Sequence, residues 1–492
     1  MKNCKSVTVI VLFFLTQAGS SYGQTSKMSA KAVQVRIKQV ENNLSAWTQI
    51  ENKPQRWTLE ERMKFYHANG VSIAVIKNYK LEWAKGYGWA DSLAQKPVTT
   101  QTLFQAGSNS KSLNAMGILK LVQEGKLNLR ADINDYLKTW KFPYDAVSKG
   151  RRITIANLLS HTAGLTVHGF NGYEKGDTIP TIVQILNGQK PANSAAVRAA
   201  YEPGLKYEYS GGGTTIAQLI IQDVTGKPYA EYMWQNVLKP MGMIASSYAQ
   251  PPSKEKLLAT GYYNDGRAVK GKYHIYPEQA AAGLWTNPTD LAKYVIETQL
   301  SLQGKSQKVL SKELTTLRLT PFIDAKAALG VFIIDKNGVK NFEHGGVDEG
   351  FVSQYVGTMT GGNGVVVMTN TYNTDFFDEI VRSVASVYNW KNAYTPEIKK
   401  ETFIKNESLQ PYLGKYGIGT FIWSIIKKDN AAYLSITDNE HWGTCLWKMH
   451  FTSENSFFVL EKNSSFNFIK DNTGKIIGLN WNGEDVLKKA EE

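Results

Sequence analysis

The chain has 492 residues, of which 42% are hydrophobic and 20% are charged, and its formal net charge is +13. This is ordinary globular composition, and the length allows more than one domain. The basic residues are not collected into a run and no nucleic-acid-binding motif is present, so we expect no nucleic-acid partner. The positive charge is compatible with binding to an anionic cell-envelope surface, but a generally basic exported protein is the preferred interpretation.

The first 23 residues have the pattern of a secretory signal peptide. Residues 1–5 are short and basic, residues 7–15 form an apolar run, and residues 21–23 resemble a small-residue cleavage site. A membrane anchor is the weaker alternative, because this run is far shorter than the roughly 20 residues that a bilayer span requires. We therefore expect an exported chain, periplasmic or secreted, without a transmembrane anchor after cleavage.

The two cysteines support neither a disulfide nor a metal site. Cys4 precedes the apolar run, where a lipid-modified cysteine would not lie, and cleavage would leave Cys445 alone. We therefore expect no internal disulfide in the mature chain, no metal and no cofactor.

A helix, a hairpin and a second helix are predicted in the first part of the mature chain. Residues 27–47 show a loose helical spacing of apolar side chains. Residues 71–76 and 81–89 are typical of two strands joined by a tight turn at residues 78–80. The stretch 104–120 then predicts a helix that begins near Ser108.

Ser108 and Lys111 are candidates for an activated nucleophile. Residues three apart on a helix share a face, so the Lys111 ammonium can lie beside the Ser108 hydroxyl. A helix N-terminus also presents unpaired N–H groups and a positive dipole end, which favour a developing oxyanion. The alternative is that Ser108 only caps the helix, since serine is a preferred N-cap residue. Matching residues elsewhere in the chain must decide between these interpretations.

The mainly helical region that follows contains His161 and Tyr209. Residues 155–160 predict a short helix that ends in a turn at His161, for which we prefer a structural role to a catalytic one. A tyrosine just before the glycines at 211–213 can project its hydroxyl into a cleft, because glycine allows close approach of the backbone. Equally, Tyr207 and Tyr209 could be strand aromatics on one face.

An antiparallel sheet is predicted further along the chain. The strand patterns lie at residues 327–334, 341–344, 351–359 and 364–370. Helices are expected at 288–302 and at 376–388, and the second of these should cover the sheet.

His344 lies within the predicted sheet and is followed by Gly345 and Gly346. Two glycines leave room for a substrate along the strand edge, where backbone N–H groups can reach it. We therefore favour a substrate-facing role for His344 over that of a polar residue satisfied within the strand.

The last part of the chain predicts a second domain. Residues 393–410 are polar and aperiodic, which indicates a linker between a main domain at 24–392 and a C-terminal domain at 411–492. The C-terminal domain has short aromatic-rich strands separated by turn residues, a pattern typical of a small antiparallel barrel or sandwich. A packed aromatic core explains this pattern better than an interior ligand site.

Three motifs follow one another in the main domain: Ser108-x-x-Lys111, Tyr209-Ser210-Gly211 and His344-Gly345-Gly346. In this order the sequence resembles the serine penicillin-recognising superfamily of class C β-lactamases, D-alanyl-D-alanine carboxypeptidases, esterases and D-aminopeptidases. The resemblance covers roughly residues 71–390 and includes the flanking segments 158–165 and 202–204. It implies an α+β fold in which helices flank an antiparallel sheet, with a mainly helical subdomain. The C-terminal pattern resembles the small antiparallel β-barrel that follows this domain in some members.

The resemblance also implies roles for the residues of the three motifs. Ser108 would be the acylated nucleophile, Lys111 would help to remove its proton, and Tyr209 would act as general base or proton relay. His344 would orient the substrate or tune the tyrosine. The oxyanion would be held by the backbone N–H groups of Ser108 and Val347.

One position departs from the superfamily pattern. The middle motif usually ends in an asparagine that contacts the substrate amide, whereas here the position is Gly211. Loss of that side chain leaves acylation possible but argues against efficient use of β-lactam or acylamino substrates. We therefore expect an exported peptidase or esterase that acts on small amide or ester substrates, cell-wall peptides among the candidates.

Two alternatives stay open. One is a class C-like β-lactamase, and the other is a non-catalytic penicillin-binding sensor or envelope binding protein. The presence of a hydroxyl, an amine and a phenol in the three motifs favours an enzyme. The sequence leaves the oligomeric state open.

Overall fold

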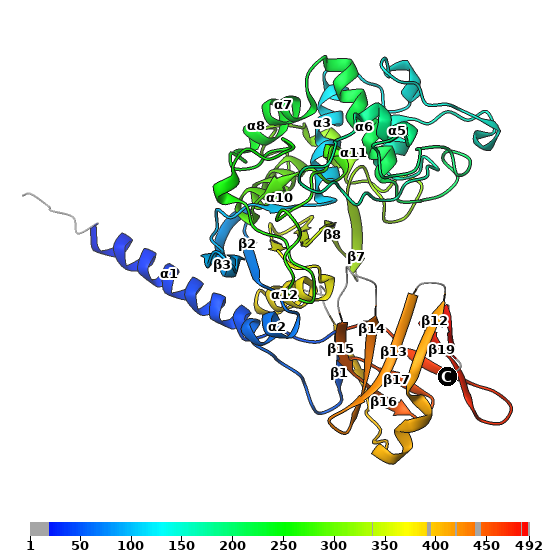
Figure 1. The fold of residues 1–492 in the computed structure, drawn as a ribbon. Coiled ribbons are helices and arrows are strands. Elements are labelled where there is room, and N and C mark those ends of the chain that lie inside the picture. Colours follow the sequence, from blue (N-terminus) through cyan, green and yellow to red (C-terminus); the bar gives the residue numbers. More distant parts are fainter. Residues whose placement is uncertain are drawn as a thin grey trace, which may run out of the picture.

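A seven-stranded antiparallel sheet lies at the centre of the main domain (Figure 1). The computed structural model describes residues 19–336, 338–390, 395–418, 421–437, 444–483 and 485–490. Residues 1–18 of the predicted signal peptide therefore lie outside the described residues, and helix α1 (Gly19–Glu41) includes the rest of it.

The sheet confirms the antiparallel arrangement expected from the sequence. Its strand order is β4-β3-β2-β10-β9-β8-β7. The strands are β2 (Gly70–Lys77), β3 (Lys80–Asp91), β4 (Lys96–Pro97), β7 (Phe332–Lys336), β8 (Val339–Asp348), β9 (Phe351–Thr358) and β10 (Gly364–Thr369). Strands β2 and β3 form the predicted hairpin, with Asn78 at φ 52° and Tyr79 at φ 62° in its two-residue turn.

Side-chain alternation along the strands gives the sheet two buried faces. On β2, Val71, Ile73 and Val75 pack in one apolar cluster with α12 (Thr374–Val387), as the sequence predicts for the covering helix. Ala74 and Ile76 belong to the other cluster, which contains α3 (Asn109–Gln123) and α10 (Pro288–Leu302). The nucleophile helix and α12 therefore lie on opposite faces of the sheet.

The helical subdomain packs on the α3 face (Figure 1). Besides α1, α3, α10 and α12, the α-helices of the main domain are α2 (Leu59–Phe65), α4 (Ile155–Leu159), α5 (Ile182–Asn187), α6 (Gly211–Thr225), α7 (Tyr229–Met233), α8 (Lys239–Met241), α9 (Gln279–Ala282) and α11 (Lys312–Arg318). A short ladder also joins β5 (Phe104–Gln105) to β6 (Trp285–Thr286) just before α3.

Several predicted elements have different bounds in the structure; the strand expected at 341–344, for example, is β8 and extends over Val339–Asp348. The helix expected over 27–47 ends at Glu41, and Thr48–Ile50 forms strand β1, which pairs in parallel with β11 (Glu397–Lys399). The strand expected from 327 begins at Phe332. In the case of the helix, a pairing between residues about 350 apart overrides the loose helical periodicity.

The C-terminal domain is a nine-stranded, antiparallel, barrel-like sheet, as the sequence predicts. Its order is β15-β14-β13-β12-β20-β19-β18-β17-β16. The strands are β12 (Gly414–Ile418), β13 (Phe421–Lys428), β14 (Ala431–Thr437), β15 (Thr444–Lys448), β16 (His450–Ser453), β17 (Ser456–Phe458), β18 (Phe466–Lys470), β19 (Ile476–Trp481) and β20 (Asp485–Lys489). Buried Trp423, Phe457, Phe466 and Phe468 give it an aromatic core.

The barrel packs against the α2 and α12 side of the main domain (Figure 1). Arg62 on α2 lies within 2.6 Å of Glu379 on α12 and 3.2 Å of Glu461 on the barrel. Lys462 of the barrel donates to Asp375 at 2.9 Å. The barrel therefore lies across the sheet from the nucleophile helix.

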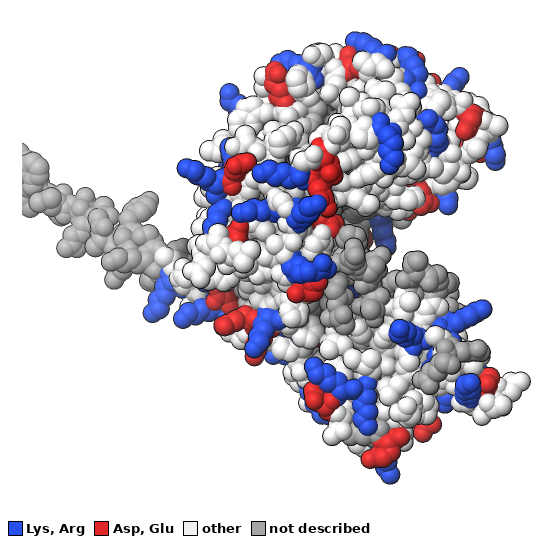
Figure 2. Space-filling model, in the orientation of Figure 1, with Lys and Arg blue, Asp and Glu red and all other residues white. Residues whose placement is uncertain are grey.

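Surface charge is mixed on the face that Figure 2 shows. Lys and Arg are interspersed with Asp and Glu there, and they do not merge into one continuous basic surface. Among the described residues, no helix is both long enough and apolar enough to cross a membrane.

Candidate active site

Ser108 lies in a tight turn at the start of α3. Gly107 before it has φ +50°, and Ser108 itself has helical dihedral angles and is half-buried. Its side chain makes no capping hydrogen bond to the described backbone of this helix, although it is the N-cap residue. The hydroxyl instead accepts a hydrogen bond from Lys111 Nζ at 2.9 Å.

Lys111 is a buried amine. Only 4% of the residue is exposed, and Nζ donates a second hydrogen bond to the carbonyl of Ala281 at 2.8 Å. Burial lowers the pKa of Lys111 to about 7, while the charge of Asp348 acts in the opposite direction. A large share of the lysine is therefore an uncharged amine near neutral pH.

Tyr209 lies beside the Lys111 amine. It directly precedes Ser210, the N-cap of α6, and Lys111 Nζ lies 4.9 Å from the centre of its ring. Burial raises the pKa of Tyr209, and a hydrogen bond with Ser108 partly offsets this. The phenol therefore keeps its proton at neutral pH and can pass it on.

His161, for which the sequence favoured a structural role, packs against Tyr209. The two rings lie 4.3 Å apart with planes inclined by 35°, and the Ser210 N–H donates to His161 Nδ1 at 3.2 Å. His161 is buried with φ +57°, an uncommon conformation for a histidine. Burial holds its pKa well below the ordinary value, so the ring is neutral.

His344 is also neutral, and the strand directs it inward. Residues 344, 346 and 348 of β8 are buried, whereas 345 and 347 are exposed. Its ring lies 6.3 Å from that of Tyr209, and Nδ1 donates to the Gly345 carbonyl at 2.6 Å. Nε2 has no hydrogen-bond partner among the described residues. Burial lowers the pKa of His344 to about 3.

The glycines of the third motif bring β8 against the turn that precedes α3. A Cβ atom on Gly346 would lie 1.9 Å from the Ala106 carbonyl oxygen and 2.9 Å from the Ser108 nitrogen. One on Gly107 would lie 2.5 Å from the Val347 nitrogen. Only glycine permits this approach, which brings the Ser108 and Val347 backbones close together.

Gly211 lies close to Phe170 and to a backbone carbonyl. This residue opens α6 and donates its N–H to the His168 carbonyl at 3.1 Å. A Cβ atom there would lie 3.0 Å from the Phe170 ring and 3.1 Å from that carbonyl oxygen. The ring of Phe170 thus lies in tight contact with the position where a longer side chain would begin.

The structure therefore places Lys111 and Tyr209 beside the Ser108 hydroxyl, and β8 lies next to the same turn. This arrangement can remove a proton from the hydroxyl and supply two backbone N–H groups to a neighbouring oxyanion. The sequence did not predict that the Ala281 carbonyl and Asp348 belong to this site. The carbonyl has no signal in the sequence, whereas Asp348 lies two residues after Gly346 and could have been noted there.

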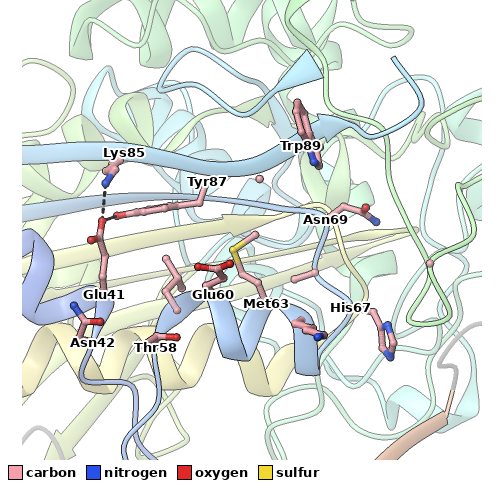
Figure 3. Close-up of a pocket in the computed structure, with 15 residues that line it drawn as sticks. Glu41, Asn42, Thr58, Glu60, Met63, His67, Asn69, Lys85, Tyr87 and Trp89 are labelled. Carbon is pink, nitrogen blue, oxygen red and sulfur yellow. Dashed lines mark hydrogen bonds and ion pairs between the residues drawn. The ribbon is translucent and has the colours of Figure 1, made fainter. Parts of the chain in front are cut away.

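A cavity of about 850 Å³ lies elsewhere, between α2, β3 and the end of α1 (Figure 3). Met63, Tyr87 and Trp89 contribute apolar surface, and Glu41 accepts hydrogen bonds from Lys85 and Tyr87. Ser108, Lys111, Tyr209 and His344 are not among the residues that line it. Within the described part of the chain, no cluster of three or more His, Cys, Asp or Glu side chains could hold a metal ion.

Comparison with known proteins identifies relatives of the main domain. The family model described as Beta-lactamase matches residues 56–388. Protein flp of Staphylococcus aureus (strain N315) is 28% identical over 329 residues, which are 66% of this chain and 64% of that protein. The match thus spans just under two thirds of the length of this relative.

Solved structures share the fold. A penicillin-binding protein homologue from Pyrococcus abyssi, described as octameric, superposes with a TM-score of 0.59 at 24% identity, covering 87% of this chain and 98% of that chain. D-amino acid amidase from Ochrobactrum anthropi SV3, complexed with L-phenylalanine amide, gives a TM-score of 0.55 at 20% identity and covers 67% of this chain and 96% of that one.

Proposed function

The chain belongs to the beta-lactamase family, and from this premise we propose that it is a serine hydrolase that forms an acyl-enzyme at Ser108. The observation that carries the proposal is the 2.9 Å hydrogen bond from Lys111 Nζ to Ser108 Oγ. It joins a half-buried hydroxyl to an amine whose pKa is lowered to about 7 by burial. A serine hydroxyl is a weak nucleophile until such a base removes its proton.

The proposed reaction has two halves. In the first, neutral Lys111 takes the Ser108 proton as Oγ attacks the substrate carbonyl, and the N–H groups of Ser108 and Val347 hold the oxyanion. Tyr209 then donates its proton to the leaving amine or alcohol and regains one from Lys111. In the second half, water attacks the ester, its proton passes to the same groups, and Ser108 is released with the acid product.

Small amides and esters are the proposed substrates, which makes the protein a peptidase or an esterase. Support comes from Gly211, which has no amide side chain and lies in tight contact with Phe170. A structural neighbour at 20% identity is described as a D-amino acid amidase complexed with L-phenylalanine amide. A class C-like β-lactamase is the alternative activity, and the same acyl-enzyme would serve it.

Export is part of the proposal, because residues 1–23 have the charge and apolar pattern of a signal peptide. N-terminal sequencing of the chain secreted by a bacterial host would test it. Cleavage near residue 23 supports export, and retention of the full N-terminus in the cytoplasm contradicts it.

Intact-protein mass spectrometry tests the acyl-enzyme. The protein is incubated with a p-nitrophenyl ester, a D-amino acid p-nitroanilide or a fluorescent penicillin. We expect a mass gain equal to the acyl group, absent in Ser108→Ala and retained in Ser253→Ala, which changes an exposed serine. No adduct and no turnover with any probe would favour a binding protein. A penicillin adduct with rapid turnover would favour the β-lactamase.

A further inference from the structure

Asp348 joins the end of β8 to the nucleophile turn, which we define as residues 106–109. Its Oδ2 accepts the N–H of Gly107 at 3.1 Å. Only 4% of the residue is exposed, so this contact is sheltered from water. A buried hydrogen bond of this kind fixes two chain segments that are about 240 residues apart in sequence.

The position of this hydrogen bond gives it a specific consequence. Gly107 directly precedes Ser108, and Asp348 directly follows Val347. The hydrogen bond therefore connects the residues next to the two proposed oxyanion donors. The backbones are already in contact here, because a Cβ atom on Gly107 would lie 2.5 Å from the Val347 nitrogen.

A second side chain fastens the same turn from β9. Ser353 Oγ donates to the Ala106 carbonyl at 2.9 Å and accepts from Asn109 Nδ2 at 2.7 Å. Ser353 is also the register partner of Gly346 across the β8–β9 ladder. The turn is thus held at both ends by β9 and at its centre by Asp348.

The surroundings of Asp348 favour the protonated form of its carboxyl group. Burial raises the pKa of Asp348 well above its ordinary value, while the Lys111 charge and the Gly107 N–H lower it. Glu278 and Glu349 add negative charge that favours the protonated acid. A neutral carboxyl still accepts a hydrogen bond through its carbonyl oxygen, and so does the amide of an asparagine.

We propose that Asp348 is a positioning residue that sets the distance between the Ser108 and Val347 N–H groups by holding the Gly107 N–H. The inference rests on the proposed function, in which these two groups stabilise the oxyanion. Because the oxyanion develops only as the reaction proceeds, loss of this positioning lowers kcat more than it raises KM.

Asp348→Ala and Asp348→Asn separate this role from general stability. Alanine removes the acceptor, whereas asparagine keeps an oxygen in the same place. Asp135→Ala is the matched control, since Asp135 is an exposed carboxylate in the short helix Ile133–Asp135. Circular dichroism and thermal melting check that each variant is folded.

The first readout is amide hydrogen exchange of the peptide that contains residues 106–109. We expect faster exchange in Asp348→Ala than in the wild type, with protection largely restored in Asp348→Asn and unchanged in Asp135→Ala. This readout needs no activity, so it tests the contact even if no substrate is turned over. Equal protection in the wild type and Asp348→Ala would overturn the proposal.

The second readout is the steady-state kinetics of p-nitrophenyl ester hydrolysis. A misplaced oxyanion donor should lower kcat by about 10- to 100-fold in Asp348→Ala, with KM changed less than about threefold. Asparagine should recover most of that loss. Equal losses in the Asn and Ala variants, or a loss confined to KM, would overturn the positioning role. Failure of the wild type to acylate would instead count against the proposed function.

Discussion

The pH dependence of acylation should report directly on the buried lysine. The perturbation is a change of pH from 5 to 9 with the wild type, repeated with Lys111→Arg. Burial lowers the pKa of Lys111 to about 7, and only the neutral amine can accept the Ser108 proton. We therefore expect kcat/KM to rise tenfold per unit below pH 7 and to level off above it, so that the rate at pH 5 is about 100-fold below the plateau.

The size of the effect follows from the shift itself. A lysine with the ordinary pKa of 10.5 would be neutral in about one molecule in 3,000 at pH 7, whereas Lys111 is neutral in about half. Burial thus increases the competent fraction by about a thousandfold. Arginine stays charged throughout this range, so Lys111→Arg should lose at least about a thousandfold in rate without recovery up to pH 9.

Stopped-flow acylation with a p-nitrophenyl ester measures these rates. His161 and His344 should not contribute to the fall in rate below pH 7, because burial lowers the pKa of His344 to about 3 and holds that of His161 well below its ordinary value. A flat profile between pH 5 and pH 8, or an Arg variant with near-normal rates, would refute the reasoning.

Three further outcomes follow from the packing around the site and the barrel. His161→Ala should lower kcat by about 10-fold or more with little change in KM, because Tyr209 loses the ring packed against it and the Ser210 N–H loses its acceptor. Steady-state kinetics that show equal effects on kcat and KM would contradict this. Gly211→Ala should lower the free energy of unfolding by about 1–3 kcal/mol, because the added methyl group contacts Phe170. In a double-mutant cycle Phe170→Ala should reduce this loss of stability, and additive effects of the two changes would contradict the contact. Burial raises the pKa of Glu461 to about 6 from 4.5, so the native protein binds an extra proton between these values and its stability falls as the pH rises through them. As the pH rises from 4.5 to 6.5, the melting temperature of Glu461→Gln should therefore rise relative to that of the wild type. A difference in melting temperature that calorimetry finds to be independent of pH would contradict this.

The sequence by itself determined the local elements and the principal candidates of the site. Asn287 caps a helix with Pro288 in its first turn, and the predicted bounds 288–302 match α10. Such signals depend on residues near one another in the chain. The same holds for Ser108 and Lys111, since one helical turn is enough to place an amine beside a hydroxyl.

Only the tertiary structure decided which partners these residues meet. The Ala281 carbonyl that binds Lys111, the ring of His161 against Tyr209 and the Asp348 contact to Gly107 all join distant segments. The position of the barrel on the α2 side depends in the same way on a contact between residues about 400 apart.

The pKa of Lys111 shows the physical reason for this division. Its spacing from Ser108 is local, but its pKa depends on how completely other segments exclude water from the amine. Desolvation is a property of the packed core, to which β8, α6 and α9 all contribute. The sequence thus specified the chemical groups, and the fold decided their protonation and alignment.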